Sequence, residues 1–266
     1  MAIPSGIHIF LLLLTFTGID TVASTTVFTI QNQCSYTVWP GTLSGNGGTV
    51  LGDGGFELAP GDSVQLTAQP GWSGRFWGRT ECSFDPATGA GKCATGGCGG
   101  LKCPGGGTPP VTLVEFTLAS SSSEKDFYDV SLVDGYNIGM AVKPTGDARK
   151  GDCQAAGCQE DLNKNCPPEL QVVMVEGPSP SPSPMEMEIG MGRVVACKSA
   201  CEAFNAPELC CTGDHSTPEN CPPTHYSAIF KQACPTAYSY AYDDATSTCT
   251  CSATDYTITF CPSVSN

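Results

Sequence analysis

Residues 71–103 read GWSGRFWGRTECSFDPATGAGKCATGGCGGLKC, and we interpret this stretch as the part around which the chain is organised. Its last 22 residues hold four cysteines, Cys82, Cys93, Cys98 and Cys103, separated by glycines and almost no apolar side chains. Hydrophobic burial alone cannot fold such a segment, so we expect short disulfide loops to hold it by restricting the unfolded chain. A zinc ribbon is the alternative, but the sequence has neither paired C-x2-C spacings nor a histidine nearby.

The same stretch resembles the signature of thaumatin-like proteins, the fifth class of plant pathogenesis-related proteins. GAGKCATGGC (residues 89–98) follows the pattern GxGxCxTGGC, with Gly97 at the position where the family usually has Asp. Further matches are NQCSYTVWPG (32–41), FYDVSLVDGYN (127–137), CPTAYSYAYDD (234–244) and TITFCP (257–262), which span nearly the whole mature chain.

The first 24 residues are predicted to be a signal peptide. Residues 9–16 (IFLLLLTF) form an apolar run too short to span a membrane, and Val22, Ala23 and Ser24 supply the small residues that precede a cleavage site. The 17 cysteines also indicate an oxidising compartment. We therefore expect a secreted, extracellular protein of the apoplast that begins near Thr25.

The mature chain is acidic. The net charge of the chain is −14, and removal of Asp20 with the leader leaves 12 basic against 25 acidic residues, or −13. This argues against nucleic acid or anionic lipid as the main partner, and it permits neutral sugars and basic proteins. The simpler alternative is that the acidic charge only keeps the protein soluble. We expect no cofactor, no metal site, no stable membrane insertion, and a monomer.

Most of the chain shows β patterning. Short runs of β-branched and aromatic residues at 27–30, 36–39 and 64–67 alternate with Gly, Asn and Pro turns. In residues 111–118, Val114, Phe116 and Leu118 fall on one face, whereas Glu115 falls on the other. The sequence therefore predicts a mainly β fold, a flattened antiparallel sandwich with a cystine-rich helical part and a small cystine-stapled hairpin.

The expected domains follow this patterning. The sandwich comprises residues 25–79, 114–159 and 235–266, the stapled hairpin or loop region 80–113, and the cystine-rich helical region 160–234. In the last region a helix is expected from an N-cap at Thr224 to Pro235. Residues 177–192 hold a Pro-Ser repeat and are predicted to be a flexible, removable insert, with an interaction or O-glycosylation segment as the alternative.

The resemblance implies eight disulfides and one cysteine outside them. Adjacent Cys210 and Cys211 are poorly placed to bridge each other. Cys249 is left over and is predicted to remain a thiol in the monomer. The implied pairs are Cys34–Cys261, Cys82–Cys93, Cys98–Cys103, Cys153–Cys251, Cys158–Cys234, Cys166–Cys197, Cys201–Cys210 and Cys211–Cys221.

The resemblance also implies an acidic cleft between the sandwich and the cystine-rich part. Its five residues, matched motif by motif, are Arg75, Glu115, Asp129, Asp134 and Asp243, with Asp244 as an ambiguous neighbour of the last. Strand periodicity alone does not bring Asp129 and Asp134 together, because they are five residues apart. Two carboxyls in different protonation states are what glycoside cleavage requires.

Three functions follow from the resemblance. The first is an antifungal defence protein that binds β-1,3-glucan or another fungal wall polysaccharide. The second is a weak endo-β-1,3-glucanase that uses Glu115 with Asp129 or Asp134. The third is an inhibitor of foreign hydrolases.

Overall fold

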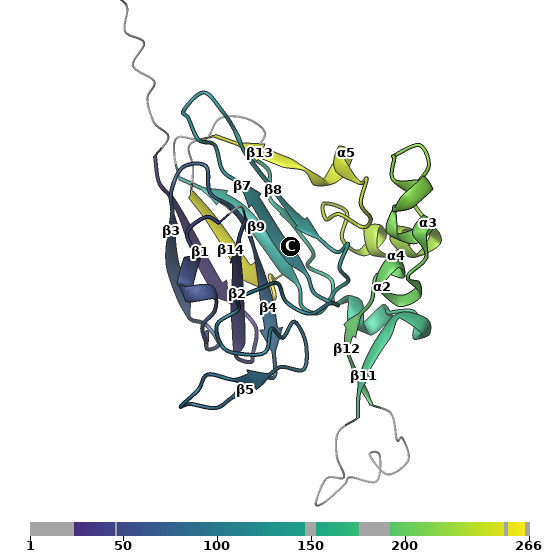
Figure 1. Ribbon diagram of the computed structural model, residues 1–266, viewed down its shortest axis with the longest axis horizontal. Coiled ribbons are helices and arrows are strands. Elements are labelled where there is room, and N and C mark those ends of the chain that lie inside the picture. The colour runs from purple at the N-terminus through teal and green to yellow at the C-terminus, as the bar shows by residue number, and fades with distance from the viewer. Residues whose placement is uncertain (1–23, 46, 147–152, 176–191, 253–254, 264–266) are drawn as a thin grey trace, which may run out of the picture.

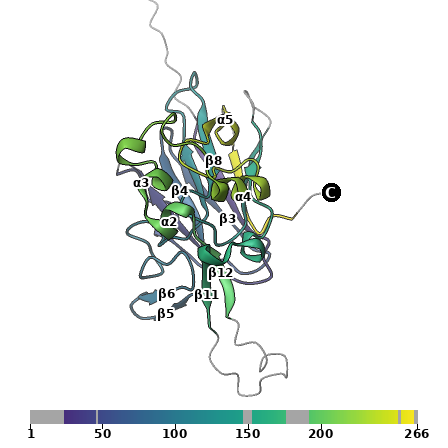
Figure 2. The same cartoon turned by 90° about the vertical axis from the view of Figure 1, so that its right-hand side faces the viewer.

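The structure is a computed structural model that describes residues 24–45, 47–146, 153–175, 192–252 and 255–263. Two five-stranded sheets pack face to face, and a helical part lies beside the second of them (Figures 1 and 2). The predicted leader, apart from Ser24, and the predicted insert, apart from Gly192, lie outside the described residues.

The first sheet has the strand order β10-β9-β14-β1-β3. The second has the order β13-β8-β7-β4-β2. The strands of the first sheet are β1 (Thr26–Asn32), β3 (Ser63–Ala68), β9 (Met140–Thr145), β10 (Ala156–Gly157) and β14 (Asp255–Phe260). Those of the second are β2 (Val38–Ser44), β4 (Ser73–Thr80), β7 (Leu113–Thr117), β8 (Asp126–Ser131) and β13 (Cys249–Cys251). The predicted mainly β sandwich is therefore confirmed.

The core lies between the two sheets and is rich in aromatic rings. Phe28 of β1 lies 4.7–5.5 Å, centroid to centroid, from Phe76 and Phe116 of the second sheet and from Trp72 just before β4. Val114 and Phe116 point into this core, as their alternation with Glu115 predicts. Edge-to-face ring packing of this kind stabilises a core beyond the area that it buries.

One pair of strands departs from the predicted antiparallel arrangement. β1 and β14, the first and last strands, pair in parallel, with Asn32 opposite Phe260. Parallel neighbours end at the same edge of a sheet, so the cysteines that follow them, Cys34 and Cys261, come together and form a disulfide. The two ends of the fold are thus joined by both a ladder and a covalent bond.

Arg79 organises the cystine-stapled region. Its guanidinium is fully buried and donates hydrogen bonds to the backbone carbonyls of Trp39, Pro40, Gly100 and Leu101. Burial lowers the pKa of Arg79 to about 10, so the side chain remains charged at neutral pH. These bonds tie β2 to a loop that has little apolar surface of its own, where β5 (Ser83–Phe84) and β6 (Gly91–Lys92) form a short hairpin.

The cystine-rich part consists of short helices and one hairpin. α4 (His225–Ala233) starts at the predicted N-cap Thr224, whose hydroxyl accepts from Ser227 N in a capping box. The other elements of this part are the hairpin of β11 (Gln171–Met174) and β12 (Arg193–Cys197), the helices α2 (Ala200–Phe204) and α3 (Pro207–Cys210), and the 3-10 turns η2 (Leu162–Asn165), η3 (Pro168–Leu170) and η4 (Gly213–His215). Outside it, the 3-10 turn η1 (Leu51–Gly54) lies between β2 and β3, and α5 (Asp244–Ser247) lies just before β13.

Eight disulfides join the same pairs that the family resemblance implies. Two lie in the stapled region, and three lie within residues 160–234. Cys249 takes part in none of the eight.

Candidate functional site

A row of charged side chains crosses the second sheet on the face away from the core. Arg75 of β4 stands opposite Glu115 of β7, which in turn stands opposite Asp129 of β8. Directly paired residues point to the same face of a sheet, and their chain neighbours point to the other. Because Phe76, Val114 and Val130 enter the core, the three charged residues must face outward, toward the cystine-rich part.

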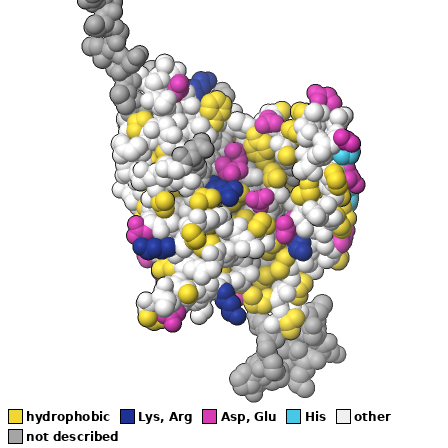
Figure 3. All heavy atoms as spheres, viewed as in Figure 1, with side chains coloured by type: hydrophobic (Ala, Val, Ile, Leu, Met, Phe, Trp, Pro, Cys, Tyr) yellow, Lys and Arg dark blue, Asp and Glu magenta, His cyan; other side chains and the backbone are white. Residues whose placement is uncertain are grey.

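This row forms the floor of a groove whose far side is the loop between α4 and β13. A cavity of about 400 Å³ is lined by the row together with Asp134, Tyr238 and Asp244. An adjoining cavity of about 330 Å³ continues from the same three row residues past Leu43 and Phe127. We call this continuous groove the acidic cleft. Figure 3 shows Asp and Glu side chains around a basic one in the hollow between the two halves.

Asp134 reaches the cleft through a turn. The chain leaves β8 at Ser131, and Gly135 N donates to Leu132 O at 3.0 Å, which closes a turn that has Asp134 inside it. Asp134 O also accepts from Val111 N at 2.9 Å, so the turn is held against the segment that leads into β7. The turn cancels the strand alternation that would otherwise point Asp129 and Asp134 in opposite directions.

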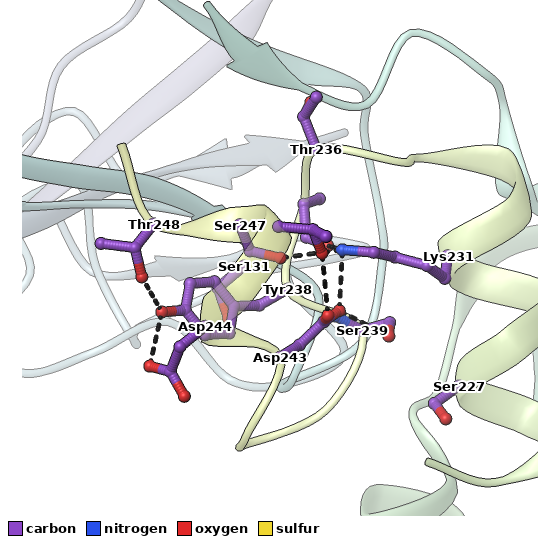
Figure 4. Close-up of polar contacts among 12 residues, drawn as sticks. Ser131, Ser227, Lys231, Thr236, Tyr238, Ser239, Asp243, Asp244, Ser247 and Thr248 are labelled. Atoms are coloured by element: carbon purple, nitrogen blue, oxygen red, sulfur yellow. Dashed lines mark hydrogen bonds and ion pairs between the residues drawn. The ribbon is translucent and has the colours of Figure 1, made fainter. Parts of the chain in front are cut away.

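The far wall of the cleft comes from the loop between α4 and β13. Tyr238 N donates to Val130 O, and Leu132 N donates to Tyr238 O, so the loop extends the ladder of β8. The Tyr238 hydroxyl donates to Asp244 Oδ1 at 2.9 Å and contacts Thr248 Oγ1 (Figure 4). This network fixes the position of the Asp244 carboxylate.

Asp243 turns the other way, into the base of the same loop. Its carboxylate pairs with Lys231 Nζ at 2.9 Å and accepts from the backbone N and the hydroxyl of Ser239 (Figure 4). Burial by itself would raise the pKa of Asp243, but the hydrogen bonds from Lys231 and Ser239 outweigh it and lower the pKa. Asp243 therefore anchors the loop, while Asp244 lines the cleft.

The carboxyls of the row have raised pKa values. Burial, with the nearby charges of Glu115 and Asp244, raises the pKa of Asp129 to about 8. Burial also raises the pKa of Glu115, which Arg75 opposes and Asp134 reinforces. A pKa of about 8 keeps Asp129 largely protonated at neutral pH, and glycoside cleavage depends on one protonated carboxyl beside an ionised one.

Two atoms of the row are buried without a hydrogen-bond partner among the described residues. They are Arg75 Nε, a donor, and Asp129 Oδ2. A buried polar atom left without a partner costs about 1–3 kcal/mol, so a ligand that satisfies it recovers that free energy. Hydroxyl groups both donate and accept, and can therefore satisfy both atoms.

Comparison with known proteins places this chain in one family. A sequence model of the thaumatin family matches residues 32–262. The chain belongs to the thaumatin family. It is 61% identical over 243 residues to the pathogenesis-related thaumatin-like protein 3.5 of Cryptomeria japonica, with 91% of this chain and 92% of that protein covered.

Two further thaumatin-family relatives also match this chain over nearly all of its length. Pathogenesis-related protein 5 of Arabidopsis thaliana is 56% identical, with 98% of this chain and all of that protein covered. A Prunus avium protein named glucan endo-1,3-beta-glucosidase is 47% identical, with 90% and 92% covered. The chain is thus a member of the pathogenesis-related thaumatin-like proteins, a class of defence proteins.

Of the five cleft residues expected from the thaumatin-family motifs, four lie together in the structure. Arg75, Glu115, Asp129 and Asp134 all line the same cavity. At the fifth position the structure favours the neighbour that sequence matching left in second place, since Asp244 lines the cavity and Asp243 does not. A run of two adjacent acids in a loop carries no sequence signal of which one faces the groove.

Sequence reasoning missed two contributors to this thaumatin-family cleft. Tyr238 lies within the motif CPTAYSYAYDD, six residues before Asp244, and only the fold shows that the two bond. Gly106 lies against Arg75, because a Cβ atom there would come within 2.6 Å of Arg75 Nη2. The Gly-rich loop beside β7 thus limits where the guanidinium can lie.

The residues that the structure describes offer neither a cluster of metal-binding side chains nor a membrane-spanning helix. They contain no group of three or more His, Cys, Asp or Glu side chains placed to hold a metal ion. They also contain no helix with the length and apolar character needed to cross a bilayer.

Proposed function

We propose that this thaumatin-family member is a secreted plant defence protein that binds β-1,3-glucan of fungal walls in its acidic cleft. The observation that carries the proposal is the row Arg75, Glu115 and Asp129, with its two partnerless buried atoms. A neutral polymer rich in hydroxyl groups can hydrogen-bond to all three side chains.

Secretion is part of the proposal. Its support is the apolar run at residues 9–16 and the eight disulfides, which form and persist in oxidising compartments. Cleavage near Thr25, measured as the N-terminal sequence of the protein recovered from apoplastic fluid, checks it. Retention of residues 1–24 would contradict it.

A second candidate is slow hydrolysis of the same glucan. The raised pKa of Asp129 favours it, because a carboxyl that remains protonated near neutral pH can donate a proton to a glycosidic oxygen. Glu115, directly opposite, would then act as the base or nucleophile. The name of the Prunus avium relative is consistent with this chemistry.

Binding of laminarin, a soluble β-1,3-glucan, tests the proposal. The double variant Glu115→Gln with Asp129→Asn should weaken binding at least tenfold, because it changes two hydrogen-bonding groups on the floor of the cleft (about 1.5 kcal/mol or more in total). Glu57→Gln, which removes one exposed charge outside the cleft, is the control. Unchanged affinity in the double variant would show that the cleft is not the glucan site.

A reducing-end assay on the same proteins separates binding from hydrolysis. Slow release of reducing ends by the wild type, lost in Asp129→Asn alone, would establish turnover. Binding without reducing ends would leave the protein a glucan-binding protein.

A further inference from the structure

A second cavity lies at the other end of β4 from the acidic cleft. Its volume is about 860 Å³, within the range of about 300–1,000 Å³ that ligand pockets occupy. Thr80 lines it, and Thr80 is five residues from Arg75 along one strand, a separation of about 17 Å at about 3.3 Å per residue. The cavity and the acidic cleft share no lining residue.

Aromatic rings from separate segments line this second cavity. Tyr36, which precedes β2, is 46% exposed, Trp39 is half-buried, and Tyr136 is buried with its hydroxyl bonded to Glu160 O. The exposed ring of Tyr36 and the half-buried ring of Trp39 are surfaces on which the C–H face of a sugar ring can pack, while Tyr136 forms a buried part of the lining.

The charges around this cavity are already paired. Arg193 forms an ion pair with Glu81, and Lys164 lies 3.7 Å from Asp161. Two acids and two bases therefore cancel, whereas the acidic cleft gathers four acidic side chains and one arginine. A charged ligand would have to compete with one of these pairs, so the lining favours a neutral one.

Asn163 adds an unused acceptor. Its Nδ2 donates to Asn137 O at 3.1 Å and to Val195 O at 3.3 Å, which fixes the orientation of the amide, because the flipped amide would place its oxygen against two carbonyls. Asn163 Oδ1 is then a buried acceptor with no hydrogen-bond partner among the described residues. Among neutral ligands, those with hydroxyl donors suit it.

We propose that this cavity is a second binding site of the protein, for a short neutral oligosaccharide, and that it works independently of the acidic cleft. A polymer that occupied both sites would be held more tightly than by either alone, since the second contact is then intramolecular. Only the choice of β-1,3-glucan as one of the probes below rests on the proposed function.

Tryptophan fluorescence can observe this site directly. Of the three tryptophans, Trp39 lines the cavity, whereas Trp72 and Trp77 are buried elsewhere. We would titrate the protein with three neutral hexasaccharides, laminarihexaose, xylohexaose and mannohexaose. At least one should change the emission in a saturable way.

Matched variants assign the signal. Tyr36→Ala should weaken this binding about tenfold, the effect of losing one ring contact. Phe204→Ala removes a ring of similar exposure (43%) that lines neither site, and it should leave the affinity unchanged. The double variant Glu115→Gln with Asp129→Asn should also leave it within twofold of the wild type.

Three outcomes would overturn the proposal. They are no saturable response to any of the three sugars, equal affinity in Tyr36→Ala, and loss of the response in the Glu115→Gln, Asp129→Asn variant. A different result would contradict the proposed function, namely unchanged laminarin affinity in the Glu115→Gln, Asp129→Asn variant.

Discussion

Asp129 makes the stability of the protein depend on pH at the scale of a single residue. Its pKa rises from about 3.8 to about 8 on folding, so between these values the folded state binds more protons than the unfolded state. The stabilisation from this proton is complete below about pH 4 and disappears as the pH rises to about 8. Asp129→Asn removes this pH-dependent stabilisation.

We therefore expect the Tm of the wild type to fall, relative to that of Asp129→Asn, as the pH rises from about 4 to about 8. Calorimetric melting of the two proteins over this range measures the difference. Parallel Tm curves would mean that Asp129 titrates normally in the folded protein.

A second residue-scale prediction concerns Gly106. Gly106→Ala places a methyl group 2.6 Å from Arg75 Nη2, and the flexible guanidinium must move away. We expect laminarin binding to weaken with a Tm within a few degrees of the wild type. Gly105→Ala is the control, since a Cβ there meets no atom within 4 Å. Equal binding by both variants would show that the position of Arg75 is unimportant.

At the scale of an element, the loop between α4 and β13 forms one wall of the cleft and is anchored by a partly buried ion pair. Lys231 donates to Asp243, to Ser247 Oγ and to Ala237 O from the last turn of α4. Charged hydrogen bonds that are largely shielded from water contribute more than exposed ones. The pair thus holds the segment that carries Tyr238 and Asp244.

Lys231→Met should therefore lower the free energy of unfolding by about 2 kcal/mol and also weaken laminarin binding. Lys102→Met, which breaks the exposed pair with Asp53, should cost no more than about 0.5 kcal/mol and leave binding intact. Denaturant unfolding and the binding assay check both effects. Destabilisation with normal binding would mean that the wall of the cleft does not need this anchor.

At the scale of the whole molecule, disulfides replace part of the hydrophobic core. Cys34–Cys261 spans 227 residues and joins the first and last strands, whereas Cys98–Cys103 spans 5. The entropy removed from the unfolded chain grows with the logarithm of loop length, which gives about 5 kcal/mol for the first bridge and about 2 kcal/mol for the second.

Replacing both cysteines by serine should accordingly lower the Tm more for Cys34 and Cys261 than for Cys98 and Cys103. Thermal unfolding of the two double variants measures this order. The reverse order would indicate that the stapled region, with its small core, limits the stability of the whole protein.

Local sequence patterns predict the β strands, the outward face of Glu115 and the capped start of α4. Each depends on the period of a strand or the chemistry of a cap, and both act over a few neighbouring residues. The family motifs in the sequence also predict the eight disulfide pairs and four of the residues that line the cleft. These contacts join distant parts of the chain, so the periodicity of a single strand or helix does not predict them.

Tertiary structure alone decided the rest. It paired β1 with β14 in parallel, turned Asp134 back toward Asp129, and directed Asp244 into the cleft and Asp243 toward Lys231. It also gathered Tyr36, Tyr136 and Asn163 around a second cavity. The parallel pairing of β1 with β14 and the lining of the second cavity join segments distant in the chain. The directions of Asp134 and Asp243 instead depend on a turn and on an ion pair with the nearby Lys231, which no strand period predicts.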